Sequence, residues 1–310
     1  MKRKSVDILL AAYNGSDFIA EQIESILKQS YKNIRLLIRD DGSIDSTLDI
    51  IKKYISLDAR VVLIADSFAS NGCGENFKRL IQASEADYIL FSDQDDVWFD
   101  NKVELLVNYA NKNFKSELAL VSSPGLVVDE NLTVLKGCVT RNALNIERLN
   151  DLLCGNGGIQ GCSLLVTRAL CDASMRMKDC YWYMHDHIIT LYAACYGEIH
   201  DLPVHTFLYR QHNNNVLGYN NTSLWLTLKR LVSSTTLLEK RYLSALHDFI
   251  DTESHRISEL NASLITGFLS VVEQRSRIKM ACFFIKNKIT VRRSSLIGVV
   301  KVFLSRKIVG

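Results

Sequence analysis

The sequence predicts an α/β fold: a mostly parallel central sheet with helices on both faces, followed by a C-terminal helical region. Two patterns lead to this prediction. Over the first half of the chain, short apolar runs alternate with segments of helical period, which is the order that builds a parallel sheet. From Ser223 onward the helical period continues throughout.

The predicted strands and helices alternate along the start of the chain. Val6–Ala11 is a continuous apolar run, as in a buried strand, and Phe18–Gln29 carries apolar residues at the spacing of one helix face. In chain order, the remaining predictions are strands at Ile34–Ile38, Val61–Ala65 and Tyr88–Phe91 and helices at Ser46–Tyr54 and Asn101–Ala110. Ligands of such sheets bind beyond the carboxyl ends of the strands, so the polar residues found there form the candidate site.

The pattern is weaker in the second half of the chain. A loop rich in Asn and Gly leads into a predicted strand at Cys162–Val166, and we expect a helix at Asp186–Tyr196. A boundary near 216–219 gives an α/β domain at 1–218 and a helical, basic region at 219–310.

The net charge of +3 conceals an uneven distribution of charge. Ten of the 37 Lys and Arg residues, and none of the 34 Asp and Glu residues, lie in the tail at 274–310, so residues 1–273 carry a net charge of −7. The net negative charge of residues 1–273 argues against nucleic acid as a partner. The tail favours an anionic membrane surface, although no apolar run approaches the roughly 20 residues of a spanning helix. The alternative is a helical pair packed on the α/β domain with a solvated basic face.

The cysteines and the N-terminus indicate a cytoplasmic protein. The eight cysteines form no Cys-x-x-Cys pair and no zinc spacing, so we interpret them as reduced thiols. The N-terminal apolar run contains Asp7 and is too short for the apolar core of a signal peptide. We expect a cytoplasmic protein that associates peripherally with the inner face of the cell membrane.

Two polar clusters follow the first two predicted strands: YNG at 13–15 and DDGS at 40–43. These loops are neighbours in a doubly wound sheet, so an aromatic ring, an amide and a carboxylate meet in one crevice that suits a base and ribose. Two glycine-containing turns with helix-capping side chains are the alternative interpretation of either loop. No G-x-G-x-x-G follows the first strand and no G-x-x-x-x-G-K occurs, which argues against a dinucleotide dehydrogenase and a P-loop nucleotidase.

The third cluster, SDQDDVW at 92–98, places three carboxylates within four residues. Asp93, Asp95 and Asp96 follow an apolar strand directly, and such crowding costs like-charge repulsion unless a cation is bound. Carboxylate oxygens with open positions suit Mg²⁺ or Mn²⁺ that bridges a diphosphate. An acidic N-terminus of the next helix is the alternative, but a helix cap requires neither three carboxylates nor Trp98.

The segments AAYNG, RDDGSIDST and LFSDQDDVW stand in the order and approximate spacing of the family 2 glycosyltransferases, and the chain resembles that family. The resemblance implies the nucleotide-sugar-binding fold called GT-A. Three later segments, GGIQGCSLLVTR at 157–168, MHDHIITLYAACYG at 184–197 and LYRQHNNNVLG at 208–218, look like those of bacterial rhamnosyltransferases of polysaccharide and O-antigen synthesis. Beyond residue 219 the sequence is generic.

The resemblance implies roles for individual residues. Asp41 matches the position that binds the base, and Asp93 and Asp95 match the D-x-D pair for ribose and metal, with Asp96 in support. Asp186 matches the general base; a helix-start carboxylate without a catalytic role is the alternative. The other positions implied to contact the nucleotide sugar are Ala12, Tyr13, Asn14, Gln94, Arg210 and His212.

The function implied is an inverting glycosyltransferase that depends on Mn²⁺ or Mg²⁺. A carboxylate base accepts the proton of the acceptor hydroxyl, which attacks opposite the departing diphosphate and so inverts the sugar carbon. The resemblance favours L-rhamnose from dTDP-rhamnose and a saccharide or lipid-linked acceptor. His187 stands where rhamnosyl members often carry Trp, which keeps UDP-hexoses open. A nucleotide-sugar-binding protein without transfer activity is the alternative class, whereas a nucleotidyltransferase would normally show a Gly-rich phosphate loop.

Overall fold

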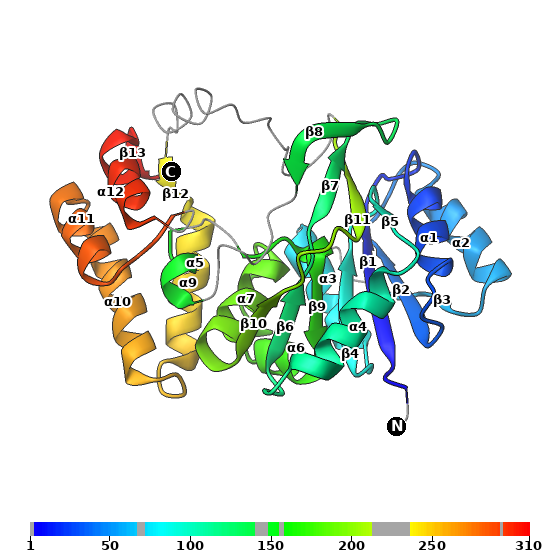
Figure 1. Ribbon diagram of the computed structural model, residues 1–310, viewed down its shortest axis with the longest axis horizontal. Helices are drawn as coiled ribbons and strands as arrows, with labels where there is room; N and C mark the ends of the chain where they lie inside the picture. Colours follow the sequence, from blue (N-terminus) through cyan, green and yellow to red (C-terminus); the bar gives the residue numbers. More distant parts are fainter. Residues whose placement is uncertain (1–2, 67–71, 140–147, 155–157, 213–235, 292–293) are drawn as a thin grey trace.

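The computed structural model describes residues 3–66, 72–139, 148–154, 158–212, 236–291 and 294–310. Its centre is a seven-stranded sheet in the order β10-β6-β9-β4-β1-β2-β3 (Figure 1). The strands are β1 (Val6–Ala12), β2 (Ile34–Asp40), β3 (Val61–Leu63), β4 (Tyr88–Ser92), β6 (Ala119–Ser122), β9 (Leu164–Thr167) and β10 (Glu198–Asp201). All neighbours pair in parallel except β9, which runs antiparallel to β4 and β6. The predicted mostly parallel sheet is therefore confirmed.

A second, four-stranded sheet in the order β5-β11-β7-β8 lies near the carboxyl ends of the central strands (Figure 1). Its strands are β5 (Val97–Trp98), β7 (Gly125–Val128), β8 (Val134–Val139) and β11 (Phe207–Arg210). β5 directly follows the carboxylate cluster after β4, and β11 leads into Gln211 and His212. The pairing of β5 with β11 thus brings two distant segments together beside the predicted site.

Helices cover both faces of the central sheet. α1 (Ile19–Leu27), α2 (Thr47–Leu57) and α4 (Lys102–Asn113) share a buried core with Ile8 and Leu10 of β1. The opposite core contains Leu9 and residues of α3 (Cys73–Ala83), α5 (Leu149–Leu152), α6 (Arg168–Ser174) and α7 (His185–Tyr196). Consecutive side chains of a strand point to opposite faces, so these two groups of helices lie on opposite sides of the sheet.

The C-terminal region consists of helices and one short parallel strand pair. Its helices are α9 (Lys240–Glu253), α10 (Glu259–Glu273), α11 (Arg277–Lys286) and α12 (Ser295–Leu304), and β12 (Thr236–Leu238) pairs with β13 (Lys307–Val309). Tyr242 and Phe249 of α9 belong to the same buried core as α7, so this region packs on that side of the sheet. The boundary expected near 216–219 lies outside the described residues. Among the helices that the structure describes, none has the length and apolar character needed to cross a membrane.

The structure differs from the sequence-based expectations in several places, among them the second sheet, whose strands are absent from the predicted elements. The region expected to be helical throughout contains β12 and β13, because three-residue strands are too short to leave a period in the sequence. The strand expected from Cys162 begins at Leu164, since Gly161–Ser163 forms a 3₁₀ turn. The helix α3 is absent from the predicted elements because Gly74 and Asn76 are weak helix formers. The seven cysteines among the described side chains are all free, as expected.

Candidate active site

The loop after β1 is tied to the loop after β2 by Asn14. Its backbone N–H donates to Ser43 Oγ at 2.8 Å, and its side-chain Oδ1 accepts from the N–H of Ile44 at 2.9 Å. Asn14 has a φ of 47°, a left-handed conformation that Asn tolerates better than most residues. The side chain predicted to contact the nucleotide therefore holds the two loops together.

Gln94 joins the loop after β1 to the loop after β4. Its Oε1 accepts from the backbone N–H of Tyr13, and its Nε2 donates to the Tyr13 carbonyl, both at 2.9 Å. A Cβ on Gly15 would come within 2.2 Å of Gln94 Oε1, so a larger residue would displace this amide. We call this pair of hydrogen bonds the Gln94 clasp. The Tyr13 side chain stays 57% exposed, which leaves its ring available to stack on a base.

A buried arginine of β2, Arg39, orients the carboxylate of Asp41. Its guanidinium donates to both oxygens of Asp66 at 3.0 and 2.7 Å and to Asn76 Oδ1 at 3.2 Å. It also donates to Asp41 Oδ1 at 3.4 Å. The N–H of Asp41 donates to the Ala12 carbonyl at 2.8 Å, so the residues predicted to bind the base lie side by side.

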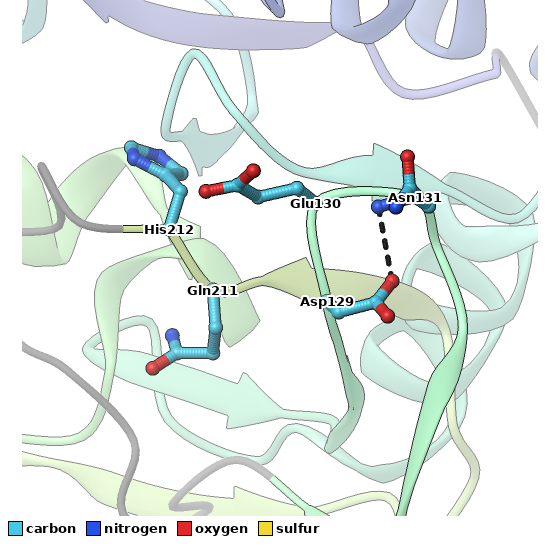
Figure 2. A pocket seen from close by; sticks show the side chains of 5 residues that line it. All are labelled: Asp129, Glu130, Asn131, Gln211 and His212. Atoms are coloured by element: carbon cyan, nitrogen blue, oxygen red, sulfur yellow. Dashed lines mark hydrogen bonds between the residues drawn. The ribbon is translucent and has the colours of Figure 1, made fainter.

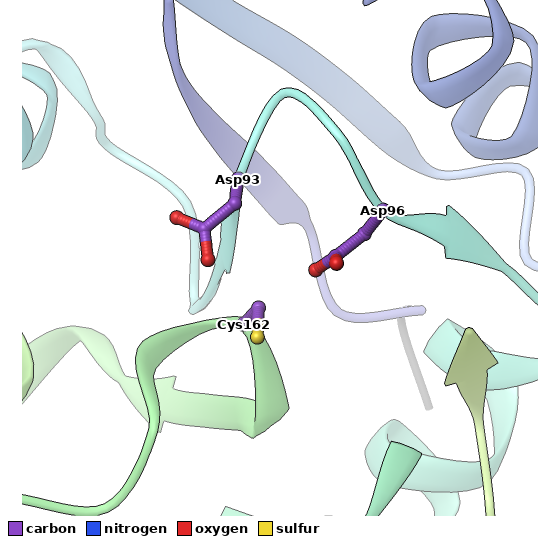
Figure 3. Close-up of side chains that lie close together, drawn as sticks. All are labelled: Asp93, Asp96 and Cys162. Carbon is purple, nitrogen blue, oxygen red and sulfur yellow. The ribbon is translucent and has the colours of Figure 1, made fainter. Parts of the chain in front are cut away.

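The three carboxylates after β4 contact different partners. Asp95 Oδ2 lies 2.8 Å from His212 Nε2, and the Nε–H of Arg210 donates to the Asp95 carbonyl at 2.9 Å. Asp93 and Asp96 instead approach Cys162, and one ligand atom of each of these three residues lies within 4.8 Å of the others (Figure 3). The predicted metal-binding residues therefore have different nearest partners, His212 for Asp95 and Cys162 for Asp93 and Asp96, but they remain close enough that the charge of Asp95 raises the pKa of both other carboxylates.

Asp96 is fully buried, and neither of its carboxylate oxygens has a hydrogen-bond partner within the described part of the chain. Burial raises its pKa well above the usual value, and the charges of Asp95 and Asp93 raise it further. A buried carboxylate without a partner is costly, so this group requires a proton, a cation or a nearby positive charge.

Lys102, the first residue of α4, supplies positive charge near Asp96. Its Nζ donates to the Cys162 carbonyl at 2.6 Å and lies 3.9 and 4.0 Å from the ring centroids of Trp98 and Phe207. Burial lowers the pKa of Lys102, whereas the charge of Asp96 partly restores it. The ammonium group is thus enclosed by two aromatic rings and a carbonyl, all of which favour a cation.

The side chains in this part of the site fit a hard divalent cation only in part. Asp95 and His212 present a carboxylate oxygen and an imidazole nitrogen, both of which Mn²⁺ accepts. Asp96 has unpartnered oxygens within the described part of the chain, as a cation ligand does before binding. Cys162 does not fit, because burial raises the pKa of its thiol well above the usual value and a neutral thiol is a poor ligand for Mg²⁺ or Mn²⁺.

A cavity of about 380 Å³ opens beside His212 (Figure 2). Asp129, Glu130 and Asn131 line it from the turn between β7 and β8, and Gln211 and His212 line it from the chain that follows β11. The N–H of Asn131 donates to Asp129 Oδ1 at 2.9 Å, which shapes the turn. Through the contact of His212 with Asp95, the cavity extends the site toward the second sheet.

The predicted base, Asp186, lies in the first turn of α7 and is 8% exposed. Its Oδ1 accepts from the N–H of His187 at 2.7 Å. Burial raises its pKa to about 6, although backbone hydrogen bonds act in the opposite direction. The pKa of Asp93 is raised by burial, by Asp95 and by Asp186. The start of α7 and the loop after β4 therefore contribute to one site.

The two histidines that flank this base are neutral core residues. His185 packs against Phe77 and Phe91, with ring centroids 3.9 and 4.6 Å away, and burial lowers its pKa to about 3. His187 packs on Tyr242 of α9 at 4.6 Å, and burial lowers its pKa to about 4. Neither ring has a hydrogen-bond partner among the described residues. The C-terminal region therefore forms part of the wall behind the base.

The comparison with protein families agrees with this geometry. The model of glycosyl transferase family 2 matches residues 7–161, which is half of the chain. The chain belongs to glycosyl transferase family 2. The matched part contains the loops after β1, β2 and β4 and ends before Asp186, so the predicted family and enzyme class are confirmed while the role of Asp186 stays a prediction.

Curated relatives align with part of this glycosyltransferase. The dTDP-rhamnosyl transferase RfbG of Shigella flexneri is 38% identical over 111 residues, which are 33% of this chain and 38% of RfbG. The UDP-Glc:alpha-D-GlcNAc-diphosphoundecaprenol beta-1,3-glucosyltransferase WfaP of Escherichia coli is 36% identical over 104 residues, 34% of this chain and 40% of WfaP. The similarity to either relative thus spans less than half of its length.

Solved structures share the fold of this glycosyltransferase over nearly the whole chain. The crystal structure of S. aureus TarS 1-349 in complex with UDP-GlcNAc covers 96% of this chain and 89% of its own, with a TM-score of 0.59 at 14% identity. The mannosyltransferase PcManGT from Pyrobaculum calidifontis, in complex with GDP-Man and Mn²⁺, covers 96% and 79%, with a TM-score of 0.52 at 12% identity. These likenesses confirm the GT-A fold.

Three buried residues of this glycosyltransferase site are absent from the sequence-based predictions. Arg39 carries a weak signal in the sequence, because a charged residue directly follows the apolar run Leu36–Ile38 of this strand. Lys102 carries a weaker one, since a basic residue at the start of a helix opposes the helix dipole. No sequence pattern indicates that Tyr242 contacts His187, because the two lie on separate helices.

Proposed function

We propose that this glycosyltransferase transfers a sugar from a nucleoside diphosphate to an acceptor hydroxyl with inversion, and that Asp186 is the general base. The observation that carries the proposal is that the start of α7 packs on Gly161, where a Cβ would come within 2.4 Å of His185 Nε2, while the next residue, Cys162, lies within 4.8 Å of Asp93. A pKa of about 6 leaves Asp186 ionised at neutral pH and still basic enough to accept a proton. An acceptor hydroxyl is a weak nucleophile, and this carboxylate takes its proton as the bond to the sugar forms.

In the proposed site, the loops after β1 and β2 hold the nucleotide. Tyr13 provides a ring for stacking on the base, and Asp41 provides a carboxylate that Arg39 orients. Asn14 and Gln94 contribute indirectly, because their amides hold the loops in position. Ala12 brings the backbone of β1 against the Asp41 loop without a side chain that would fill the crevice.

We propose Mn²⁺ or Mg²⁺ as the cofactor, held by Asp93, Asp95 and His212 with Asp96 in support. When bound, the cation offsets the negative charge that develops on the departing diphosphate. Asp95 and His212 already lie 2.8 Å apart, and Arg210 fixes the backbone of this loop through the Asp95 carbonyl. Mn²⁺ in PcManGT, which shares the fold, supports this choice of cofactor.

For the donor we propose dTDP-rhamnose, with a UDP-hexose as the alternative. RfbG is named a dTDP-rhamnosyl transferase and WfaP a UDP-Glc-dependent glucosyltransferase, so both names contain a pyrimidine nucleotide. The test is incubation with labelled dTDP-rhamnose, UDP-glucose, UDP-GlcNAc and GDP-mannose, with hydrolysis and transfer scored separately. A protein that binds one of these donors but turns over none of them would support the alternative of a binding protein without transfer activity.

For the acceptor we propose a saccharide or lipid-linked saccharide of cell-surface polysaccharide synthesis, reached at the cytoplasmic face of the membrane. The name of WfaP contains a diphosphoundecaprenol-linked sugar. The basic tail at 274–310 suits an anionic surface, where such an acceptor resides.

The role of Asp186 is tested with Asp186→Asn, and the exposed Asp49→Asn on α2 serves as the control. We expect Asp186→Asn to lower kcat by about 10²- to 10⁴-fold, the usual contribution of a general base, and to leave donor affinity in calorimetry unchanged. Loss of donor affinity in a folded variant would place Asp186 in the donor site. Turnover like that of Asp49→Asn would remove it from catalysis.

A further inference from the structure

Two helices of the C-terminal region, α11 and α12, lie side by side as an antiparallel hairpin (Figure 1). Arg277, at the start of α11, donates to the carbonyls of Val302, Phe303 and Ser305 at the end of α12, at 2.7, 2.8 and 2.6 Å. These are carbonyls that a helix end leaves without partners. Arg277 is therefore a structural residue that joins the start of α11 to the end of α12.

α11 exposes one apolar face of the hairpin. Ile278 and Ile285 are 70% and 64% exposed, and the exposed Cys282 lies between them. Their spacing of four and three residues places all three on one side of the helix. Met280 and Phe284, on another side, are fully buried against the rest of the region.

α12 exposes a second apolar face at the same spacing. Leu296, Val300 and Phe303 are exposed, with Leu304 next to them, while Val302 is fully buried. Because the helices are antiparallel, Ile278 lies at the same end of the hairpin as Phe303. We call the six exposed side chains the hairpin face: Ile278, Ile285, Leu296, Val300, Phe303 and Leu304. Isolated apolar residues on a surface are ordinary, but two aligned apolar stripes on adjacent helices mark an interaction surface.

The charged residues of the segment that carries the hairpin face are all positive. Lys279 and Lys286 are exposed beside the apolar stripe of α11, and Arg306 and Lys307 are exposed directly after α12. No Asp or Glu occurs at 274–310. The acidic residue that precedes this segment, Glu273, has its Oε1 3.3 Å from Nε2 of His247 on α9.

This combination of apolar and basic side chains selects one kind of partner. A second copy of the chain would place two basic surfaces against each other, which costs like-charge repulsion. An amphipathic helix that lies in a membrane interface carries apolar residues on one face and Lys or Arg beside them. Neither helix is long enough to span a bilayer, so the contact is with the surface.

We propose that the hairpin face docks on an anionic lipid surface, with its six apolar side chains among the upper acyl chains and Lys279 and Lys286 at the headgroups. The proposal identifies the residues by which this glycosyltransferase reaches the membrane where a lipid-linked acceptor is proposed to lie. It rests on exposure and charge, and it does not depend on the donor sugar or on Asp186. Binding to vesicles therefore tests it separately from transfer activity.

The experiment is co-sedimentation of the full chain with vesicles of phosphatidylcholine alone or mixed with phosphatidylglycerol. One variant removes apolar area, Ile278→Ser/Leu296→Ser/Phe303→Ser, and another removes charge, Lys279→Gln/Lys286→Gln. The matched control, Lys53→Gln/Leu57→Ser, changes an exposed basic and an exposed apolar residue of α2, a helix outside the C-terminal region. Thermal unfolding verifies that each variant is folded.

We expect the wild type and the control to pellet with the mixed vesicles only and to be released by high salt. Each lysine contributes about fivefold to partitioning, so the charge variant should bind about 25-fold more weakly. The apolar variant should stay in the supernatant. A separate Phe303→Trp variant should show a blue shift of fluorescence and quenching by brominated acyl chains when mixed vesicles are added.

Three results would overturn the proposal. The first is pelleting of the apolar and charge variants to the same extent as the control. The second is a wild-type dimer in sedimentation velocity without lipid that the apolar variant converts to a monomer, which would assign the hairpin face to self-association. The third is a fluorescence spectrum of the Phe303→Trp variant that vesicles leave unchanged, since insertion requires a change of environment.

Discussion

Replacing Glu253 by Gln measures how firmly the C-terminal region is joined to the rest of this glycosyltransferase. Glu253, in the last turn of α9, is fully buried. It accepts hydrogen bonds from Arg176 Nε at 2.8 Å and from the hydroxyl groups of Tyr192, at 3.0 Å, and Tyr196. Both tyrosines lie on α7, the helix that carries the proposed base in its first turn, so one carboxylate connects α9 to that helix.

The expected loss of stability follows from these contacts. Glutamine retains one acceptor oxygen but removes the charge and turns an NH₂ group toward the donors. A hydrogen bond to a charged group contributes about 1.5–3 kcal/mol, and removal of one partner of a buried ion pair costs about 3–5 kcal/mol. Arg176 is 35% exposed, so water compensates for part of the interaction with Glu253 that Arg176 loses. We therefore expect Glu253→Gln to lower the free energy of unfolding by about 3 kcal/mol.

The assay is urea unfolding followed by circular dichroism, with the exposed Glu259→Gln at the start of α10 as the control. The pH dependence provides a second readout. Burial alone would raise the pKa of Glu253, but hydrogen bonds from Tyr196, Arg176 and Tyr192 outweigh it and lower the pKa from 4.5. A carboxyl group with a lowered pKa stabilises the fold above its unfolded value and loses that contribution as the pH falls toward its folded value.

The difference in stability between the wild type and Glu253→Gln should therefore be fully present at neutral pH and shrink as the pH falls below about 4.5. A difference within about 0.5 kcal/mol of that seen for Glu259→Gln would refute the reasoning, because surface substitutions produce changes of that size. A difference that persists unchanged in acid would show that packing, and not the charge, is responsible.

Four further results are expected at the site. Asp95→Asn keeps shape and removes charge, so metal-dependent turnover should fall by about 10²-fold or more; an unchanged Mn²⁺ or Mg²⁺ titration would place the cation elsewhere. Gly15→Ala drives a methyl group into the Gln94 amide and should weaken donor binding in calorimetry about tenfold; unaltered affinity would make the clasp dispensable. Lys102→Met removes the positive charge of Lys102 near Asp96 and should lower the midpoint of thermal unfolding by several degrees, at roughly 2–4 °C per kcal/mol for a chain of this size. A midpoint equal to that of the wild type would contradict the stabilisation of Asp96 by Lys102. The rate should decline as the pH drops through about 6, because a protonated Asp186 accepts no proton; a flat profile there argues against this base.

The nucleotide side of the site was predictable from the sequence because its parts are local. Each polar cluster comes directly after a strand, and parallel neighbouring strands end at the same edge of a sheet. That rule alone places Tyr13, Asp41 and Asp93 together. The resemblance to the family added Asp186, which lies far along the chain and follows no strand directly.

The contact partners of the three carboxylates were not predictable, because they depend on contacts between distant segments. Asp95 turns to His212 since β11 pairs with β5, and strands of two to four residues leave no readable period. Lys102 meets the Cys162 carbonyl only when α4 and the turn before β9 pack together. Two side chains also have other partners than predicted. The amides of Gln94 and Asn14 were expected to contact the nucleotide sugar, but in the structure they form hydrogen bonds with the backbone. The identity of a residue predicts which groups can form a hydrogen bond, but it does not predict which partner they bond in the folded protein.

The Gln94 clasp has a thermodynamic consequence. Two hydrogen bonds join the backbone of Tyr13 to the side chain that stands between Asp93 and Asp95, so the two loops are constrained to move as one unit. A ligand that orders either loop has then already met part of the entropic cost of ordering the other. Linkage makes this effect reciprocal: the factor by which a cation strengthens nucleotide affinity must equal the factor by which the nucleotide strengthens cation affinity. Part of that coupling free energy would be carried by a single neutral amide of the protein.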